Sequence, residues 1–155
     1  NPDLYPQLTG IQYLNFISDI YGVGKEQRNE LIIKYAALFE LTDNLGDIVS
    51  SYSHGMKQKL VIIGALVHKP KLLVMDEPFV GLDPKATYSM KEIMRDICAE
   101  GGAIFFSTHV LEVAEKLCNK IAIIKGGRLV ANGDTQDVIG NESLEETFLE
   151  LYNEK

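Results

Sequence analysis

The sequence has 155 residues, the length of a single domain that can bury a hydrophobic core. Hydrophobic residues make up 46% and charged residues 24% of the chain, as is typical of a soluble globular protein. The net charge of −7 argues against nucleic acid as the main partner, because nucleic-acid binding needs a basic surface. The longest apolar run, Leu60 to Val67, is far shorter than the roughly 20 residues that span a membrane. If a membrane is involved, we expect a partner to span it.

The first part of the chain, about residues 1–69, is predicted to form a helical subdomain without strands. Capping-box spelling at Thr9–Gln12 predicts the start of a helix that ends near Gly22. The apolar stripe expected on this helix comprises Ile11, Leu14, Phe16, Ile17, Ile20 and Tyr21. A second helix is predicted over about residues 25–39, and its inward face comprises Leu31, Ile32, Tyr35, Leu38 and Phe39.

The next informative stretch is Tyr52-Ser-His-Gly-Met-Lys-Gln-Lys-Leu60, which leads into an apolar helix ending near Val67. Ser53 stands where a helix begins, and Gly55 lets the backbone approach a ligand closely. Free N–H groups at such a helix start form an anion site. A plain serine cap with no ligand is the simpler interpretation of these residues taken alone, so both remain open.

A short apolar run, Leu72 to Met75, predicts a strand of a parallel sheet that is buried on both faces. It ends in Asp76 and Glu77, at the end of a strand where open α/β sheets bind ligands. One carboxylate at such a place can hold Mg²⁺ and the other can accept a proton from water. The following Gly81-Leu-Asp-Pro84 predicts a tight turn in which Asp83 caps a helix.

The remaining elements alternate between helices and strands. A helix from Pro84 to about Glu100 is followed by a second buried strand, Ala103 to Thr108, which ends at His109. A lone histidine after a strand is commonly a capping or structural residue. Further elements are predicted as a helix over 110–118, a strand over 121–124, a hairpin partner over 128–131 and a capped terminal helix from Ser143.

The two cysteines, Cys98 and Cys118, have no metal-ligand spacing and both fall in helical patterns. We expect reduced thiols in the core rather than a disulfide bridge, which fits the cytosol.

Three of these stretches together resemble the motifs of ABC-type ATPases. The run from Leu72 through Asp76-Glu77-Pro78 to Gly81-Leu-Asp-Pro84 resembles their Walker B motif and D-loop. The stretch from Tyr52 resembles the ABC signature, usually spelled Leu-Ser-Gly-Gly-Gln, with His54 and Met56 as departures. His109 resembles the switch histidine. The fold implied is an incomplete P-loop NTPase core with parallel strands, over about residues 70–155, plus the N-terminal helical subdomain that carries the signature.

The resemblance implies a role for each motif residue. Asp76 would help to hold Mg²⁺, Glu77 would act as the base toward water, and His109 would contact the γ-phosphate of ATP. In such proteins two subunits sandwich ATP head to tail, so the signature would reach nucleotide on the opposite subunit. The signature residues concerned are Ser53, His54, Gly55 and Met56. Asp83 would touch the facing subunit near the cleavage site.

The sequence contains no Gly-x-x-x-x-Gly-Lys-[Ser/Thr], because Gly24-Lys25 is followed by Glu26 and lacks the upstream glycine. We therefore expect a C-terminal portion of a longer ATP-binding subunit that is inactive by itself. The spelling Tyr-Ser-x-Gly-Met-x-Gln is common in bacterial drug and antibiotic exporters. The resemblance implies a membrane-spanning permease and a second ATP-binding subunit as partners, at the cytoplasmic face of the cell membrane.

The permease would dock on the helical subdomain, where Tyr13, Phe16 and Tyr21 are candidates unless they belong to the core. Two other functions remain open at this point. One is a soluble ABC protein that acts in translation or on DNA, and a second P-loop upstream would favour it. The other is a non-catalytic regulatory module, which the intact Asp76-Glu77 pair and His109 argue against.

Overall fold

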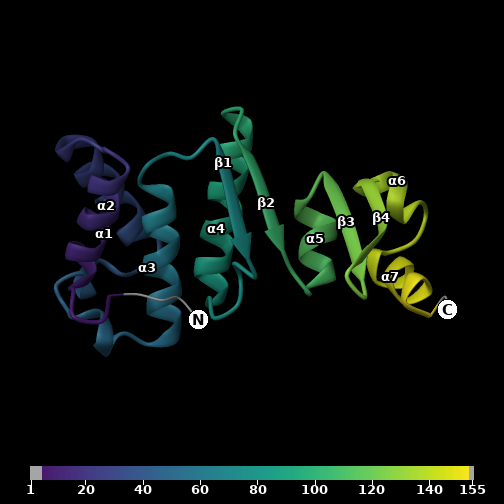
Figure 1. Cartoon of the computed structure of the whole chain (residues 1–155), viewed down its shortest axis with the longest axis horizontal. Coiled ribbons are helices and arrows are strands. Elements are labelled where there is room, and N and C mark those ends of the chain that lie inside the picture. Colours follow the sequence, from purple (N-terminus) through teal and green to yellow (C-terminus); the bar gives the residue numbers. More distant parts are fainter. Residues whose placement is uncertain (1–4, 154–155) are drawn as a thin grey trace. The chain divides into compact units, whose positions relative to one another are not determined.

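The computed structural model describes residues 5–153, which divide into two compact units (Figure 1). The first unit contains residues 5–75 and 79–105, and the second contains residues 76–78 and 106–153. Within this described range, every helix is too short or too polar to cross a membrane.

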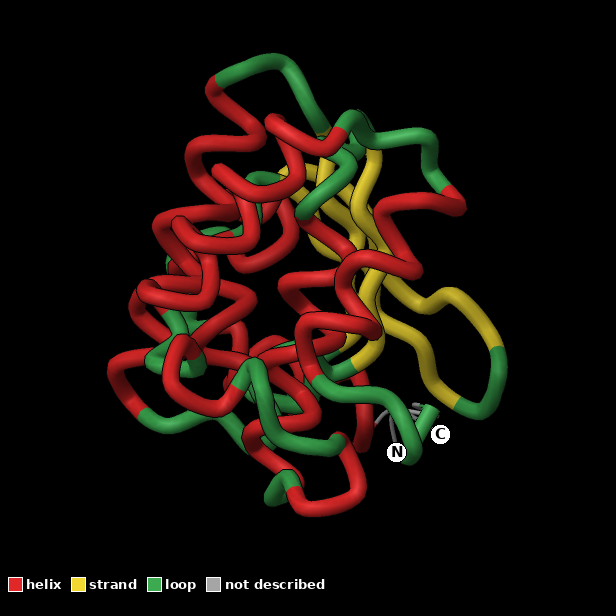
Figure 2. Tube along the Cα trace, turned by 90° about the vertical axis from the view of Figure 1, so that its left-hand side faces the viewer, coloured by secondary structure: helices red, strands yellow, loops and turns green. Residues whose placement is uncertain are grey.

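The first unit begins with helices, as predicted. Figure 2 draws the helices of the chain in red and the strands in yellow. Its helical elements are α1 (Gly10–Ile20), α2 (Lys25–Leu38), the 3₁₀ turns η1 (Thr42–Asn44) and η2 (Val49–Ser51), and α3 (His54–Leu66). The capping box is confirmed, because Thr9 Oγ1 accepts a bond from the Gln12 amide at 3.3 Å and Gln12 Oε1 accepts one from the Thr9 amide at 2.9 Å. The inward face of α2 is confirmed except at Leu38, which is 37% exposed.

The buried face of α1 differs from the predicted stripe. Leu14 is fully buried, but Phe16, Ile20 and Tyr21 are exposed. The reason is that α1 packs closely against α3. At Gly64 of α3 the two helices are so close that an added Cβ atom would lie 3.3 Å from the Tyr13 ring of α1. This contact turns Tyr13, Leu14 and Ser18 inward. The buried Ser18 hydroxyl donates to the Leu14 carbonyl at 2.7 Å and is thereby satisfied.

The first unit continues with a strand–helix–strand segment, and the last residues of both strands belong to the second unit. Its elements are β1 (Leu72–Asp76), α4 (Pro84–Ala99) and β2 (Ala103–Ser107). The two strands pair in parallel, with the Ala103 amide donating to the Lys71 carbonyl at 2.8 Å. As predicted, Asp83 caps α4, because its Oδ1 accepts from the Ala86 amide at 2.8 Å.

The prediction that both strands are buried on both faces is wrong. Leu73 is buried, but Val74 is 64% exposed and Phe105 is 65% exposed. The described sheet has only these two strands, and the alternating burial along β1 shows that one face is packed while the other faces solvent.

The second unit is built around an antiparallel hairpin, which confirms the predicted strand pair. Its elements are α5 (Leu111–Leu117), β3 (Lys120–Lys125), β4 (Arg128–Asp134), α6 (Thr135–Ile139) and α7 (Leu144–Asn153). Gly126 and Gly127 supply the positive φ angles of the turn, +56° and +75°. Ile123, Ile139 and Leu144 form the centre of its core. The capping box at Ser143 is confirmed by its bonds with Glu146, whereas α6 was not predicted.

Both cysteines are free thiols, as expected, but Cys98 is not in the core. It lies on the exposed side of α4, whose buried positions are Ala86, Met90, Ile93 and Met94. Cys118 is half-buried at the end of α5, and burial raises the pKa of its thiol.

Candidate functional site

The two acids at the end of β1 are held by Ser107, the last residue of β2. The Ser107 hydroxyl donates to Asp76 Oδ1, and the Glu77 amide donates to the Ser107 carbonyl and hydroxyl oxygens, each at 3.2 Å. Glu77 adopts a left-handed backbone conformation with φ of +46°. This conformation is rare for a residue with a side chain, and it directs the chain away from the strand immediately after Asp76.

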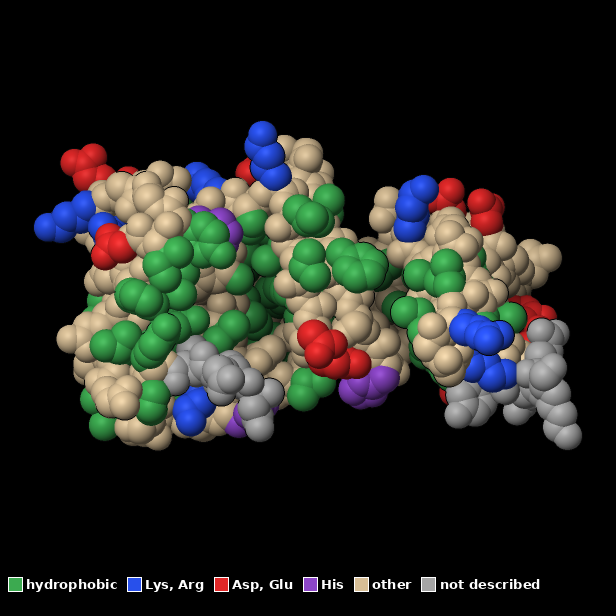
Figure 3. All heavy atoms as spheres, in the orientation of Figure 1, with side chains coloured by type: hydrophobic (Ala, Val, Ile, Leu, Met, Phe, Trp, Pro, Cys, Tyr) green, Lys and Arg blue, Asp and Glu red, His purple; other side chains and the backbone are tan. Residues whose placement is uncertain are grey.

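Glu77 and His109 lie together, although 32 residues separate them in the sequence. His109 Nδ1 is 2.8 Å from Glu77 Oε1, and both side chains are accessible, at 73% for His109 and 32% for Glu77. In Figure 3 an acidic group and a histidine lie side by side on the displayed face. A carboxylate touching an imidazole at the ends of two parallel strands can accept, hold or pass on a proton.

Asp76 presents an exposed carboxylate beside this pair. The described residues contain no group of three or more His, Cys, Asp or Glu side chains that would hold a metal alone. Such a group is not needed for Mg²⁺, which keeps several waters and binds one or two carboxylates together with substrate phosphates. A single accessible carboxylate therefore fits a magnesium ion whose other ligands are water and substrate phosphates.

The predicted signature residues form the start of α3 in the first unit. The Ser53 hydroxyl accepts a bond from the Met56 amide at 3.2 Å, so Ser53 is the helix cap. Ser53 and His54 are exposed, whereas Gly55 and Met56 are half-buried. These residues lie against the turn that contains Gly81, because a Cβ on Gly55 would come within 2.8 Å of the Gly81 carbonyl oxygen.

Asp83 lies at the end of the same turn and has two partners in its own chain. Its Oδ1 caps α4, and its Oδ2 is 2.6 Å from Lys59 Nζ. The hydrogen bond from Lys59, followed by the bond from the Ala86 amide, lowers the pKa of the Asp83 carboxyl.

The predicted site residues thus form two groups. The second unit brings together Asp76, Glu77 and His109, and the first unit brings Ser53–Met56 against Gly81–Asp83. Ser107 and Lys59 were not predicted as site residues. Ser107 was detectable as a polar residue at the carboxyl end of the neighbouring strand, and Lys59 as the residue four positions after Gly55 on one helix face.

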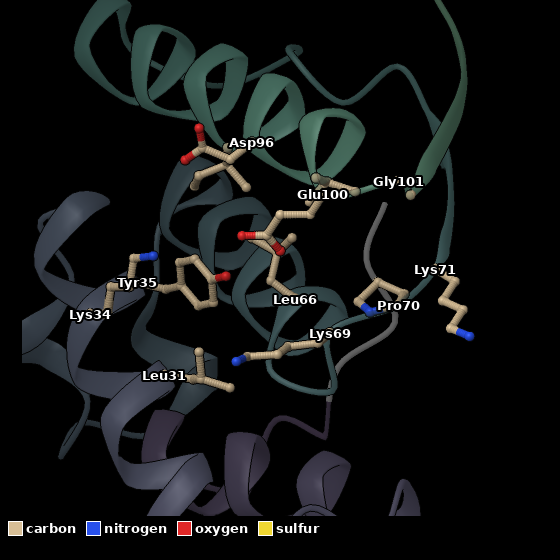
Figure 4. A pocket seen from close by; sticks show the side chains of 13 residues that line it. Leu31, Lys34, Tyr35, Leu66, Lys69, Pro70, Lys71, Asp96, Glu100 and Gly101 are labelled. Atoms are coloured by element: carbon tan, nitrogen blue, oxygen red, sulfur yellow. The ribbon is translucent and has the colours of Figure 1, made fainter.

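A cavity of about 450 Å³ lies elsewhere in the first unit, where α2, α3 and α4 end (Figure 4). Its described lining includes Lys34, Lys69, Tyr35, Asp96 and Glu100, and none of the predicted site residues. Figure 4 shows the Tyr35 hydroxyl pointing toward Glu100. Burial, followed by the negative charges of Glu100 and Asp96, raises the pKa of Tyr35.

Comparison with known proteins gives a consistent set of relatives. Residues 13–115 match a family model described as "AAA domain, putative AbiEii toxin, Type IV TA system". The linearmycin resistance ATP-binding protein LnrL of Bacillus subtilis is 32% identical over 154 residues, which cover 97% of this chain and 50% of that protein. The Nod factor export ATP-binding protein I of Rhizobium etli is 33% identical over 150 residues, covering 97% of this chain and 47% of that protein.

A solved structure, described as the ATP binding subunit of an ABC transporter, superposes with a TM-score of 0.93 at 34% identity. The match covers 97% of this chain and 65% of the solved one. The chain spans about half the length of the curated relatives described above.

Proposed function

The chain belongs to the family of the matching AAA-domain model and is a homologue of ABC transporter ATP-binding proteins, and from this premise we propose that it forms the catalytic part of an ATP-hydrolysing transporter subunit. In this proposal residues 1–69 form a helical subdomain with the signature, and residues 70–155 carry the acids and the histidine. The observation that carries the proposal is the 2.8 Å contact between His109 and Glu77.

Each residue of the second-unit group has a distinct task in hydrolysis. Glu77 accepts the proton of the attacking water. The oxygen of that water bonds to the γ-phosphorus, while the bond between the γ-phosphorus and the bridging β-phosphate oxygen breaks. His109 orients the Glu77 carboxylate through Nδ1, so that Nε2 is the ring atom left to meet the γ-phosphate. Asp76 would hold Mg²⁺, and the ion would supply charge that neutralises the phosphates.

The first-unit group acts toward a second subunit in this proposal. The start of α3, from Ser53 to Met56, meets the triphosphate bound on the opposite subunit, where its N–H groups favour negative charge. His54 adds a ring that can donate to phosphate, while Met56 offers no hydrogen bond. Asp83 lies on the surface that faces the second subunit in this proposal. Two copies, or two related subunits, therefore close over ATP and Mg²⁺.

The exposed side of α1 is the proposed docking surface for a membrane-spanning permease. Figure 3 shows apolar side chains gathered over the helical part of the first unit. Phe16 is 40% exposed and contacts the Tyr5 ring edge-on at 5.2 Å, and Tyr21 stacks on His68 at 3.8 Å. Tyr13 is excluded from this surface because it is buried in the core. Such a patch suits a protein partner.

Export is the proposed direction of transport, from the cytoplasmic face of the cell membrane. The support is the Tyr52-Ser-His-Gly-Met-Lys-Gln58 spelling, together with relatives named for linearmycin resistance and Nod factor export.

The test is Mg-ATP turnover by the complete protein. Glu77→Gln is expected to lower turnover at least about 100-fold, because an amide cannot accept the proton from water. Glu112→Gln is the matched control, since Glu112 is 75% exposed and forms a surface pair with Lys116 at 2.7 Å. Its turnover should equal that of the wild type.

The 155 residues alone are expected to turn over no ATP, because their sequence contains no phosphate-binding loop. Turnover that survives Glu77→Gln in the complete protein would contradict the proposal. Glu77-dependent turnover by the isolated 155 residues would contradict its second part.

A further inference from the structure

The start of α3 and the turn at Gly81 pack with no room for additional side-chain atoms. A Cβ on Gly55 would lie 2.8 Å from the Gly81 carbonyl oxygen, and a Cβ on Gly81 would lie 3.0 Å from His54 Cδ2. His54 therefore covers the turn of its own chain. The signature segment and the turn are in direct contact at two successive residues of the helix.

Lys59 extends this contact by one helical turn. It follows Gly55 by four residues and so lies on the same face of α3. Its side chain is only 12% exposed, and its Nζ is 2.6 Å from Asp83 Oδ2. A hydrogen bond of this length between opposite charges holds the two side chains in one geometry.

The Asp83 carboxylate is thereby shared between two helices. Oδ1 accepts the Ala86 amide and caps α4, while Oδ2 binds Lys59 on α3. The backbone contact fixes Gly81, and the ion pair fixes Asp83 two residues later. Both ends of the turn are therefore tied to α3.

A neighbouring lysine offers a contrast. Lys85, also beside the start of α4, pairs with Glu40, but both side chains are more than half exposed. Exposed ion pairs of this kind contribute little, because water screens them and long side chains lose freedom.

We propose that Lys59 is a positioning residue, which holds Asp83 so that the signature segment and the Gly81–Asp83 turn move as one body during ATP hydrolysis. This inference rests on the proposed function. Phosphoryl transfer depends mainly on placing charged groups correctly, so loosening the turn should slow the chemical step rather than weaken nucleotide binding.

The experiment measures kcat and KM for Mg-ATP in the complete protein. Lys59→Met keeps the length of the side chain and removes the charge. We expect kcat to fall about tenfold with KM changed by less than about twofold, and Lys59→Arg to restore most of kcat. Lys85→Met is the matched control and should keep the wild-type kcat.

A double-mutant cycle provides the second readout. Asp83→Asn keeps the helix cap, since asparagine caps as well as aspartate, but it removes the charge that meets Lys59. The double variant should have the same kcat as the slower single variant, because both changes remove one interaction. A thermal melt of each variant checks that it folds, and Lys59→Gln, which also removes the charge, replaces Lys59→Met in the cycle if Lys59→Met does not fold.

The inference is overturned if Lys59→Met keeps the wild-type kcat, if Asp83→Asn does so, or if the two losses multiply. The proposed function fails separately, and is recognised by wild-type turnover that is absent or does not depend on Glu77. In that case no positioning role in hydrolysis remains for Lys59 either.

Discussion

Glu77 combines an unusual backbone conformation with a side chain that is accessible to solvent. A left-handed φ of +46° directly before Pro78 lies in a sparsely populated region that costs on the order of 1–3 kcal/mol. The two bonds from its amide to Ser107 offset that cost. Strain of this kind persists where the surrounding structure fixes the position of a side chain, as His109 does for the Glu77 carboxylate.

Gly81 and Gly101 provide a matched test of the turn beside the signature segment. Both have positive φ angles, +80° and +86°, but only Gly81 has neighbours in the space that a Cβ would fill. Gly101→Ala is expected to lower the free energy of unfolding by about 1 kcal/mol from backbone strain, and Gly81→Ala by about 2 kcal/mol or more.

Urea unfolding measures both changes. In a His54→Ala background the cost of Gly81→Ala should fall toward that of Gly101→Ala, because the ring no longer blocks the new methyl group. Equal costs for the two glycines in the wild-type background would show that His54 does not cover the turn.

The lowered pKa of Asp83 predicts how the free energy of unfolding changes with pH. Because Lys59 and the Ala86 amide favour the charged form, the folded pKa lies below the ordinary value of 3.8. The stabilisation is therefore fully present above that ordinary pKa and is lost as the pH falls through the folded pKa. Between pH 6 and pH 2.5 the wild type should lose more unfolding free energy than Asp83→Asn, as measured by urea unfolding at each pH. Equal losses would mean that Asp83 is not charge-paired in solution.

At the scale of elements, α1 separates core from surface. Leu14 is fully buried, whereas Ile20 on the same helix is 62% exposed. Leu14→Ala is expected to cost about 2–5 kcal/mol of unfolding free energy, and Ile20→Ala less than about 0.5 kcal/mol. Chemical denaturation of the two variants measures both values. A larger loss for Ile20→Ala than for Leu14→Ala would reverse the assignment of the two faces.

Features set by neighbouring residues were predictable from the sequence. The helix caps at Thr9, Ser53, Asp83 and Ser143 are hydrogen bonds between residues three positions apart, so the local sequence alone identifies them. The hairpin at Gly126-Gly127 follows from the same kind of local rule.

Features set by distant residues were not predictable in this way. The inward face of α1 depends on the approach of Gly64, and the exposure of Val74 depends on the number of strands in the described sheet. The meeting of Glu77 with His109 was expected from a family resemblance rather than from spacing. The bonds of Ser107 and Lys59 join residues 24 to 31 positions apart, so the sequence places each residue in its own element but does not give its partner.

At the scale of the whole molecule, the proposed function divides the work between two groups of residues in two units. In this proposal the Asp76, Glu77 and His109 group would act on the nucleotide of its own subunit, and the Ser53–Met56 group, which lies in the other unit, would act on that of the partner. Neither group completes a site by itself in this account. Closure of two subunits over ATP is therefore its central claim.

Light scattering of the complete Glu77→Gln protein, with and without Mg-ATP, tests that claim most directly. Because binding is kept while hydrolysis is blocked, the account predicts that the measured mass doubles on adding Mg-ATP and returns to one subunit when nucleotide is removed. A mass that stays at one subunit while ATP is bound, both alone and with a related ATP-binding subunit added, would contradict it.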